Sequence, residues 1–166
     1  GGSLVAVGDE DGAVAVYNTW DGACVFEDIK EAPEGPARAM RAMAFNNDNT
    51  ILSCLAIDGR IRVYDIGRWE RVTNWQGFGG ESLEYNPTGD KMLAIDTLGQ
   101  IKLLDMVNHE QIDLEMVPGG VRVARFAGDG QYVVAMGQGG IALLSLPEGR
   151  IIKSFTARSS SGMKNI

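Results

Sequence analysis

The residues of this chain that could carry out chemistry are few and scattered. His109 is the only histidine, and no serine or cysteine stands at a spacing typical of a nucleophile paired with a histidine base. Asp9–Gly12 offers oxygen ligands of the kind that Ca²⁺ prefers, but the downstream ligands of an EF-hand are missing and residues 13–17 have the pattern of a strand. The sequence therefore predicts no catalytic residue, no metal site and no cofactor.

Composition and charge narrow the class of protein. The 166 residues are 45% hydrophobic and 22% charged, which is ordinary for a globular domain. The formal net charge of −7 argues against direct nucleic-acid binding, because phosphate contacts draw on clustered Lys and Arg. No apolar run approaches the roughly 18 residues of a membrane span, and the start of the chain lacks the features of a signal peptide. We expect no membrane association and an intracellular location, cytoplasmic or nuclear.

The two cysteines fit that location. Cys24 and Cys54 both lie inside apolar runs and show no metal-ligand spacing. We expect both to be small buried hydrophobic residues rather than a disulfide, as is usual in a reducing compartment.

The elements that position the remaining residues recur with a fixed period. Four hairpin turns carry a glycine at their second position, and the glycines are Gly12, Gly59, Gly99 and Gly139. Their separations are 59 − 12 = 47, 99 − 59 = 40 and 139 − 99 = 40 residues. A second landmark, the aromatic residue that ends a strand before a turn, keeps the same period at Phe45, Tyr85 and Phe126. Two independent landmarks indicate a repeat of about 40 residues.

Each repeat contains four short strands, which we call a to d in chain order. In the stretch 42–65, AMAFNNDNTILSCLAIDGRIRVYD, the Asn-rich turn after Phe45 and the Asp58-Gly59 turn separate apolar runs, as expected of consecutive hairpins. The expected strands are 4–8, 13–17 and 23–26 in the first unit, which lacks strand a; 39–45, 51–57, 60–65 and 70–75 in the second; 81–86, 91–96, 100–105 and 110–115 in the third; and 120–127, 131–136, 140–145 and 150–156 in the fourth.

These units define the domain organisation. They span 1–27, 37–76, 80–116 and 120–156, with an acidic, Pro-containing loop over 27–39 and a Ser-rich tail or linker over 157–166. Short strands with turn signals about every ten residues indicate an all-β fold. A repeating four-stranded unit of about 40 residues indicates a β-propeller in which each unit is one blade.

The motifs of the units resemble the WD-repeat β-propeller family. Tyr64-Asp65 stands where that family has Trp-Asp, and weaker versions are Tyr17-Asn18, Leu104-Asp105 and Leu144-Ser145. The turn 86–89 (NPTG) echoes the family's turn after strand a. The Gly-His pair before strand a is absent, and His109 follows strand c, so the repeats are degenerate. The resemblance implies a non-enzymatic protein–protein interaction scaffold that acts within a larger complex.

The number of units implies that the ring is larger than these four. Three full units and one three-stranded unit provide 15 strands, whereas propellers close with about 4 to 8 blades and unpaired end faces favour association. We expect either further sequence or another copy of the chain to complete the ring.

The resemblance also implies where a partner binds. In such propellers the d–a connections and the b–c turns share one rim, where acidic residues would favour a basic segment of a protein partner. These residues are Asp9, Glu10, Asp58 and Asp96. In the Gly-rich connection 75–79, Trp75 and Phe78 could anchor a partner, or could instead be buried between blades.

Arg41 completes the set of partner-binding candidates. It lies near the start of a strand a, where several strands converge on the central channel, as do Glu81, Ser82 and Arg122. The alternative function is therefore an enzyme or small-molecule binder with its site at that channel.

Overall fold

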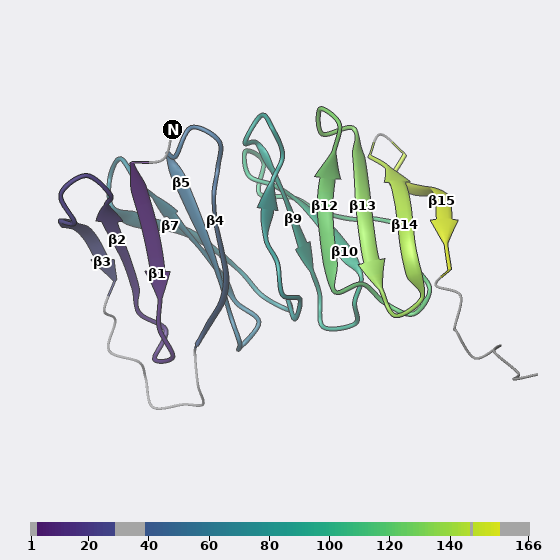
Figure 1. Cartoon of the computed structure of the whole chain (residues 1–166), viewed down its shortest axis with the longest axis horizontal. Coiled ribbons are helices and arrows are strands. Elements are labelled where there is room, and N and C mark those ends of the chain that lie inside the picture. Colours follow the sequence, from purple (N-terminus) through teal and green to yellow (C-terminus); the bar gives the residue numbers. More distant parts are fainter. Residues whose placement is uncertain (1–2, 29–38, 147, 157–166) are drawn as a thin grey trace, which may run out of the picture.

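The fold consists of antiparallel sheets arranged side by side. The computed structural model describes residues 3–28, 39–146 and 148–156, and the described residues form strands and turns without a helix (Figure 1). Blade 1 contains β1 (Leu4–Gly8), β2 (Val14–Asn18) and β3 (Cys24–Asp28). Blade 2 contains β4 (Met40–Phe45), β5 (Ile51–Ala56), β6 (Ile61–Asp65) and β7 (Glu70–Trp75). Blade 3 contains β8 (Glu84–Tyr85), β9 (Lys91–Ile95), β10 (Ile101–Asp105) and β11 (Gln111–Asp113). Blade 4 contains β12 (Val123–Ala127), β13 (Tyr132–Gly137), β14 (Gly140–Ser145) and β15 (Arg150–Phe155).

This architecture confirms the predicted fold class. Within every sheet the strands follow one another in chain order and pair antiparallel, as blades of a propeller do, and blade 1 has three strands among the described residues. No helix in the described part of the chain is long and apolar enough to cross a membrane. The predicted tail 157–166 and most of the loop 27–39 lie outside the described residues.

Strand a of blade 3 is much shorter than the predicted 81–86. The backbone amides of Gly79 and Gly80 both donate to the carbonyl of Ile95, at 3.0 and 3.1 Å, so two residues oppose one and the ladder is interrupted. A Cβ on Gly80 would lie 2.5 Å from the Cβ of Ile95, so this close approach requires glycine. Regular pairing resumes only at Glu84 and Tyr85, which leaves residues 81–83 outside the sheet.

Three apolar clusters join successive blades. One contains Val14 and Val16 of blade 1 with Leu52, Cys54 and Tyr64 of blade 2. The second joins blades 2 and 3, and the third joins blades 3 and 4. Alternate side chains of a strand therefore face the preceding blade, and the others face the following blade. Because both faces are covered in this way, strands b and c are apolar almost throughout.

Polar links accompany each apolar cluster, and one example at each boundary involves a side chain near the core. The Tyr64 hydroxyl donates to the Asp28 carboxylate at 2.9 Å, from blade 2 to blade 1. The Ser53 and Tyr85 hydroxyls are 2.6 Å apart in the core between blades 2 and 3. The backbone amide of Phe126 donates to the Glu84 carboxylate at 2.7 Å, from blade 4 to blade 3. Buried polar groups are thus satisfied across the blade boundaries.

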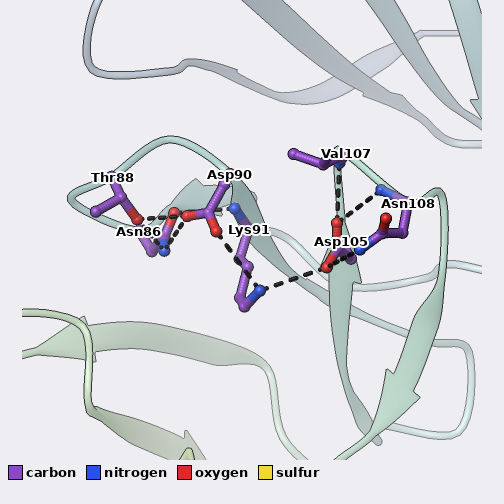
Figure 2. A network of polar contacts seen from close by, with 7 residues as sticks. All are labelled: Asn86, Thr88, Asp90, Lys91, Asp105, Val107 and Asn108. Carbon is purple, nitrogen blue, oxygen red and sulfur yellow. Dashed lines mark hydrogen bonds and ion pairs between the residues drawn. The ribbon is translucent and has the colours of Figure 1, made fainter.

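The turns at the rim opposite the b–c turns are held by a network of side chains in blade 3 (Figure 2). The Asn86 amide accepts a hydrogen bond from the Lys91 backbone amide at 2.9 Å and donates to Thr88 at 2.7 Å and to Asp90 at 2.9 Å. The Lys91 ammonium lies 3.5 Å from the Asp90 carboxylate and 3.4 Å from that of Asp105. The network therefore ties the a–b turn to the c–d turn of the same blade.

The prediction that both cysteines are buried is wrong for Cys24. Cys54 is fully buried between blades 1 and 2, and burial raises the pKa of its thiol to about 12. Cys24 is exposed because it begins β3, the outermost strand of blade 1, next to the register shift between Val16 and Tyr17. Both thiols are free.

Candidate functional site

The b–c turns and the d–a connections form one continuous rim, which we call the b–c rim. Backbone hydrogen bonds join the two kinds of segment: Phe78 N–H donates to the Gly59 carbonyl at 3.1 Å, and Val121 N–H donates to the Gly99 carbonyl at 2.8 Å. The rim runs along the lower edge of Figure 1, where the β1–β2 and β13–β14 turns are seen. Its turns are therefore fixed to their neighbours by main-chain contacts.

Glycine is required where these segments meet. Gly59 has a φ of 80°, and a Cβ at this position would lie 2.7 Å from the Phe78 carbonyl oxygen. Gly99 has a φ of 79° and would place a Cβ 3.0 Å from the Cα of Gly120. Two of the glycines that revealed the repeat in the sequence, Gly59 and Gly99, thus allow the d–a connections that follow blades 2 and 3 to pack directly on a b–c turn.

Three of the predicted acidic residues hold their own turns. The Asp9 carboxylate accepts the backbone amides of Asp11 and Ala13, at 3.0 and 2.8 Å. The Asp58 carboxylate accepts the amide of Arg60 at 3.1 Å and lies 3.7 Å from its guanidinium. Such bonds are typical of aspartate in tight turns. Glu10 is exposed beside Asp9.

Asp96 holds its own turn and also contacts a lysine of the same blade. One carboxylate oxygen accepts the amides of Leu98 and Gln100, at 2.8 and 2.9 Å, and the other lies 3.5 Å from the Lys102 ammonium. Burial of Lys102 opposes its charge, but the carboxylates of Asp113, at 2.7 Å, and Asp96 raise its pKa overall. Asp96 is therefore already partly neutralised within blade 3.

The two predicted aromatic anchors are placed in the core between blades 2 and 3. Phe78 is 2% exposed and belongs to the apolar cluster with Leu55 and Ile61, while Trp75 is half-buried against the same cluster. The indole N–H of Trp75 is buried without a partner among the described residues. Burial between blades, the alternative that the sequence left open, thus describes Phe78, so its ring is not available to form an exposed patch.

Arg41 connects two blades at the rim. Its guanidinium is exposed and donates to the Gly79 carbonyl at 2.7 Å. Because Gly79 begins the interrupted strand a of blade 3, this bond fixes the entry of that blade relative to blade 2. Ser82, also predicted near the channel, is buried.

A groove lies on the rim between blades 3 and 4, with a volume of about 360 Å³. Its walls include the exposed side chains of Glu81 and Arg122, the Asp96 turn, and Gln138 of the next b–c turn. The glycines at 79–80 and 119–120 also line it. Neither the Glu81 carboxylate nor the Arg122 guanidinium forms a hydrogen bond or ion pair with another described residue. We refer to this site as the channel groove.

The channel groove brings together residues that are far apart in the sequence. Glu81 and Arg122 were predicted near strand-a starts, and the structure places both at one site with Asp96. Gln138 was not predicted, since its Gly-rich surroundings indicated only a turn. Within the described residues, no three His, Cys, Asp or Glu side chains are placed to hold a metal ion. The groove can therefore offer one acidic and one basic group, together with backbone amides and carbonyls, to a ligand or a polypeptide.

Comparisons with known proteins agree with this architecture. The chain is 32% identical over 100 residues to "Periodic tryptophan protein 2 homolog" of Dictyostelium discoideum, and 30% identical over 83 residues to "WD repeat-containing protein 91" of Danio rerio. The β-propeller domain of Myceliophteria thermophila Cps50 (Swd1) superposes on 95% of the chain with a TM-score of 0.81. The repeats are WD-repeat-like β-propeller blades. This confirms the resemblance seen in the motifs.

The WD-repeat-like chain corresponds to only a part of each of these proteins. The matches cover 60% and 49% of the chain but 10% and 12% of the two curated relatives. The superposition, at 15% sequence identity, covers 52% of the Cps50 chain. No model of a protein family matches the sequence.

Proposed function

We propose that the chain is a non-enzymatic protein–protein interaction scaffold that acts as part of a larger complex, with the channel groove as its contact site. The observation that carries this proposal is that two oppositely charged side chains at the groove form no ion pair or hydrogen bond with another described residue. Most carboxylates on the b–c rim hold turns or pair with a lysine, whereas Glu81 and Arg122 have no partner among the described residues. The similarity of the chain to a WD-repeat protein supports a role in protein contacts.

The partner we propose carries a basic segment. Glu81 and Glu10 are exposed on the b–c rim, and the formal net charge of the chain is −7. An acidic surface attracts a basic segment over distances of about a Debye length, roughly 8 to 10 Å at physiological salt. The Arg122 guanidinium would then donate to a carboxylate or a carbonyl oxygen of the same segment and fix its register.

Panning a peptide display library against the chain tests this function. We expect enrichment of sequences with Lys or Arg, and binding of a selected peptide that weakens by at least about tenfold in Glu81→Lys, because the variant opposes like charges. The matched control is Glu110→Lys, which makes the same charge change at an exposed residue of the opposite rim. Equal loss in both variants, or enrichment without basic residues, would contradict the proposed site.

A small-molecule ligand is the second candidate for the channel groove. The presence of Glu81 and Arg122 in the lining of one groove, together with several glycines, supports it, since a small number of polar groups in a concave site is typical of ligand pockets. Screening a metabolite collection by thermal shift distinguishes the two functions. A hit whose stabilisation is lost in Arg122→Ala but not in Arg150→Ala would favour the small-molecule role over the scaffold.

We also propose an intracellular location, cytoplasmic or nuclear. Its support is the pair of unpaired thiols at Cys24 and Cys54, one of which is exposed. Free exposed thiols persist where the compartment is reducing. Fractionation of cells that express a tagged chain, followed by blotting, checks the location.

A further inference from the structure

Blades 1 and 4, at the two ends of the described array, each have an apolar face that no other described strand covers. On blade 4, Val134, Met136 and Ile141 are 37%, 51% and 42% exposed. On blade 1, Val5 and Val7 are 46% and 50% exposed. Figure 1 shows these two sheets at opposite ends of the array, so neither covers the other. Such apolar surface favours association when it is contiguous.

The face of blade 4 repeats a face that is buried inside the same chain. Cross-strand partners share one face of a sheet, so register identifies equivalent positions. Met136 pairs with Ile141 and Val134 with Leu143, as Ile95 pairs with Ile101 and Leu93 with Leu103 in blade 3. The four blade 3 residues are at most 5% exposed because blade 4 covers them. Blade 4 therefore carries the surface that a following blade would cover.

The face of blade 1 repeats one side of a different internal interface, the one between blades 1 and 2. Val5 pairs with Tyr17 as Leu52 pairs with Tyr64 in blade 2, and Val7 occupies the position of Cys54. In blade 2 these positions are fully buried against blade 1. The first blade therefore carries the surface that a preceding blade would cover.

We propose that two copies of this chain associate head to tail, with blade 4 of each copy packed on blade 1 of the other. The two faces have opposite roles in blade packing, since blade 4 copies the blade 3 side of the interface between blades 3 and 4, and blade 1 copies the blade 2 side of the interface between blades 1 and 2. The chain also spans 52% of a β-propeller domain on which 95% of it superposes, so it curves as about half of a ring. Two copies give 4 + 4 = 8 sheets, within the roughly 4 to 8 blades that close a propeller. A heterologous contact of this kind closes into a ring of defined size.

Light scattering coupled to size exclusion tests the association. The 166-residue chain has a mass of 17.8 kDa, so the proposed ring has 2 × 17.8 = 35.6 kDa. We expect this mass over a range of about 1 to 100 µM, and we expect Met136→Glu and Val7→Lys each to weaken dimerisation by on the order of 100-fold, because each buries a charge in an apolar interface. Circular dichroism verifies that each variant is folded.

A matched control and a mixing experiment identify the geometry. Val72→Glu alters a residue that is 45% exposed on β7, away from both end faces, and should leave the dimer intact. Mixing the Met136→Glu chain with the Val7→Lys chain should restore the 35.6 kDa species, since one interface is then unaltered and the other pairs opposite charges.

Three results would overturn the proposal. A 17.8 kDa species at every concentration would mean that further blades or another protein cover the faces. A ladder of larger species would mean that the contact does not close. A dimer disrupted by Met136→Glu but not by Val7→Lys would mean that two blade 4 faces pack on each other.

Discussion

The two cysteine thiols differ in their exposure to solvent. Cys54 is fully buried and burial raises the pKa of its thiol to about 12, so it carries almost no thiolate at pH 8, whereas Cys24 is exposed. We expect one thiol per folded chain to react rapidly with an aromatic disulfide reagent, and the second to react only in denaturant. Cys24→Ser should abolish the fast phase and Cys54→Ser should retain it. Two fast thiols in the folded chain would contradict the buried position of Cys54.

The Tyr64 hydroxyl is expected to contribute to stability through Asp28. Tyr64→Phe removes the 2.9 Å hydrogen bond and leaves the carboxylate without this donor, so the free energy of unfolding should fall by about 1 to 2 kcal/mol. The matched control is Tyr132→Phe, whose hydroxyl has no hydrogen-bond partner among the described residues and is expected to change stability by less than about 0.5 kcal/mol. Urea titrations followed by fluorescence measure both. Equal losses would show that the Tyr64–Asp28 link does not stabilise the chain.

Single residues were the least predictable part of the molecule. The sequence marked Glu81 and Arg122 as residues near strand-a starts, which can be located by the repeat, and the structure places both in the channel groove. It could not tell that Phe78 turns into the core, because a Gly-rich connection has no periodicity from which burial can be inferred. The turn-holding role of Asp9 and Asp96 is local chemistry, and an aspartate three residues before the turn glycine, Gly12 or Gly99, was a signal for it.

The a–b turn of blade 3 depends on one buried amide. Asn86 forms three hydrogen bonds within the turn, so Asn86→Ala leaves several backbone and side-chain groups without partners and should lower the free energy of unfolding by about 1 to 3 kcal/mol. Asn108→Ala removes an exposed amide from the facing c–d turn and should cost less than about 1 kcal/mol. Thermal or urea unfolding of the two variants gives the comparison, and a larger loss in Asn108→Ala would refute the role assigned to Asn86.

The c–d turn of blade 3 should make stability depend on acid. The backbone amides of Asn108 and Val107 lower the pKa of Asp105 to about 2 from 3.8, so the folded state favours the carboxylate. The stabilisation is complete above the unfolded pKa of 3.8 and is lost as the pH falls through the folded value of about 2. Urea midpoints measured from pH 5 to pH 2 should therefore fall less steeply in Asp105→Asn than in the parent chain. Asp129→Asn, which removes a charge from an exposed turn of blade 4, serves as the control.

Strands and turns were predicted well because their signals are local. The glycine-containing b–c turns and the apolar runs on either side of them mark each hairpin, and strand b of blade 1 was found at the expected 4–8. Strand a of blade 3 was predicted too long because the bulge at Gly79 and Gly80 depends on contacts with Ile95, 15 residues further on. The two glycines can be read from the sequence, but the donation of both their amides to one carbonyl cannot.

Across the whole molecule, the number of covered faces differs between blades. Blades 2 and 3 are packed on both faces, while blades 1 and 4 each bury one. Stability in repeat architectures is about the sum of each unit and its interfaces with nearest neighbours. The end blades of a single copy should therefore open more readily than the central blades.

Hydrogen exchange measures this gradient directly. In the Met136→Glu chain, which we expect to be monomeric, amides of β5 and β9 should exchange at least about tenfold more slowly than amides of β1 and β13, because sub-global opening begins where fewest apolar contacts are lost. In the parent chain the proposed head-to-tail contact covers both end faces, so the difference should shrink. Uniform exchange across the four blades of the monomeric variant would show that the array opens as a single unit. A gradient that persists unchanged in the parent chain would leave the end faces uncovered and argue against the ring of two copies.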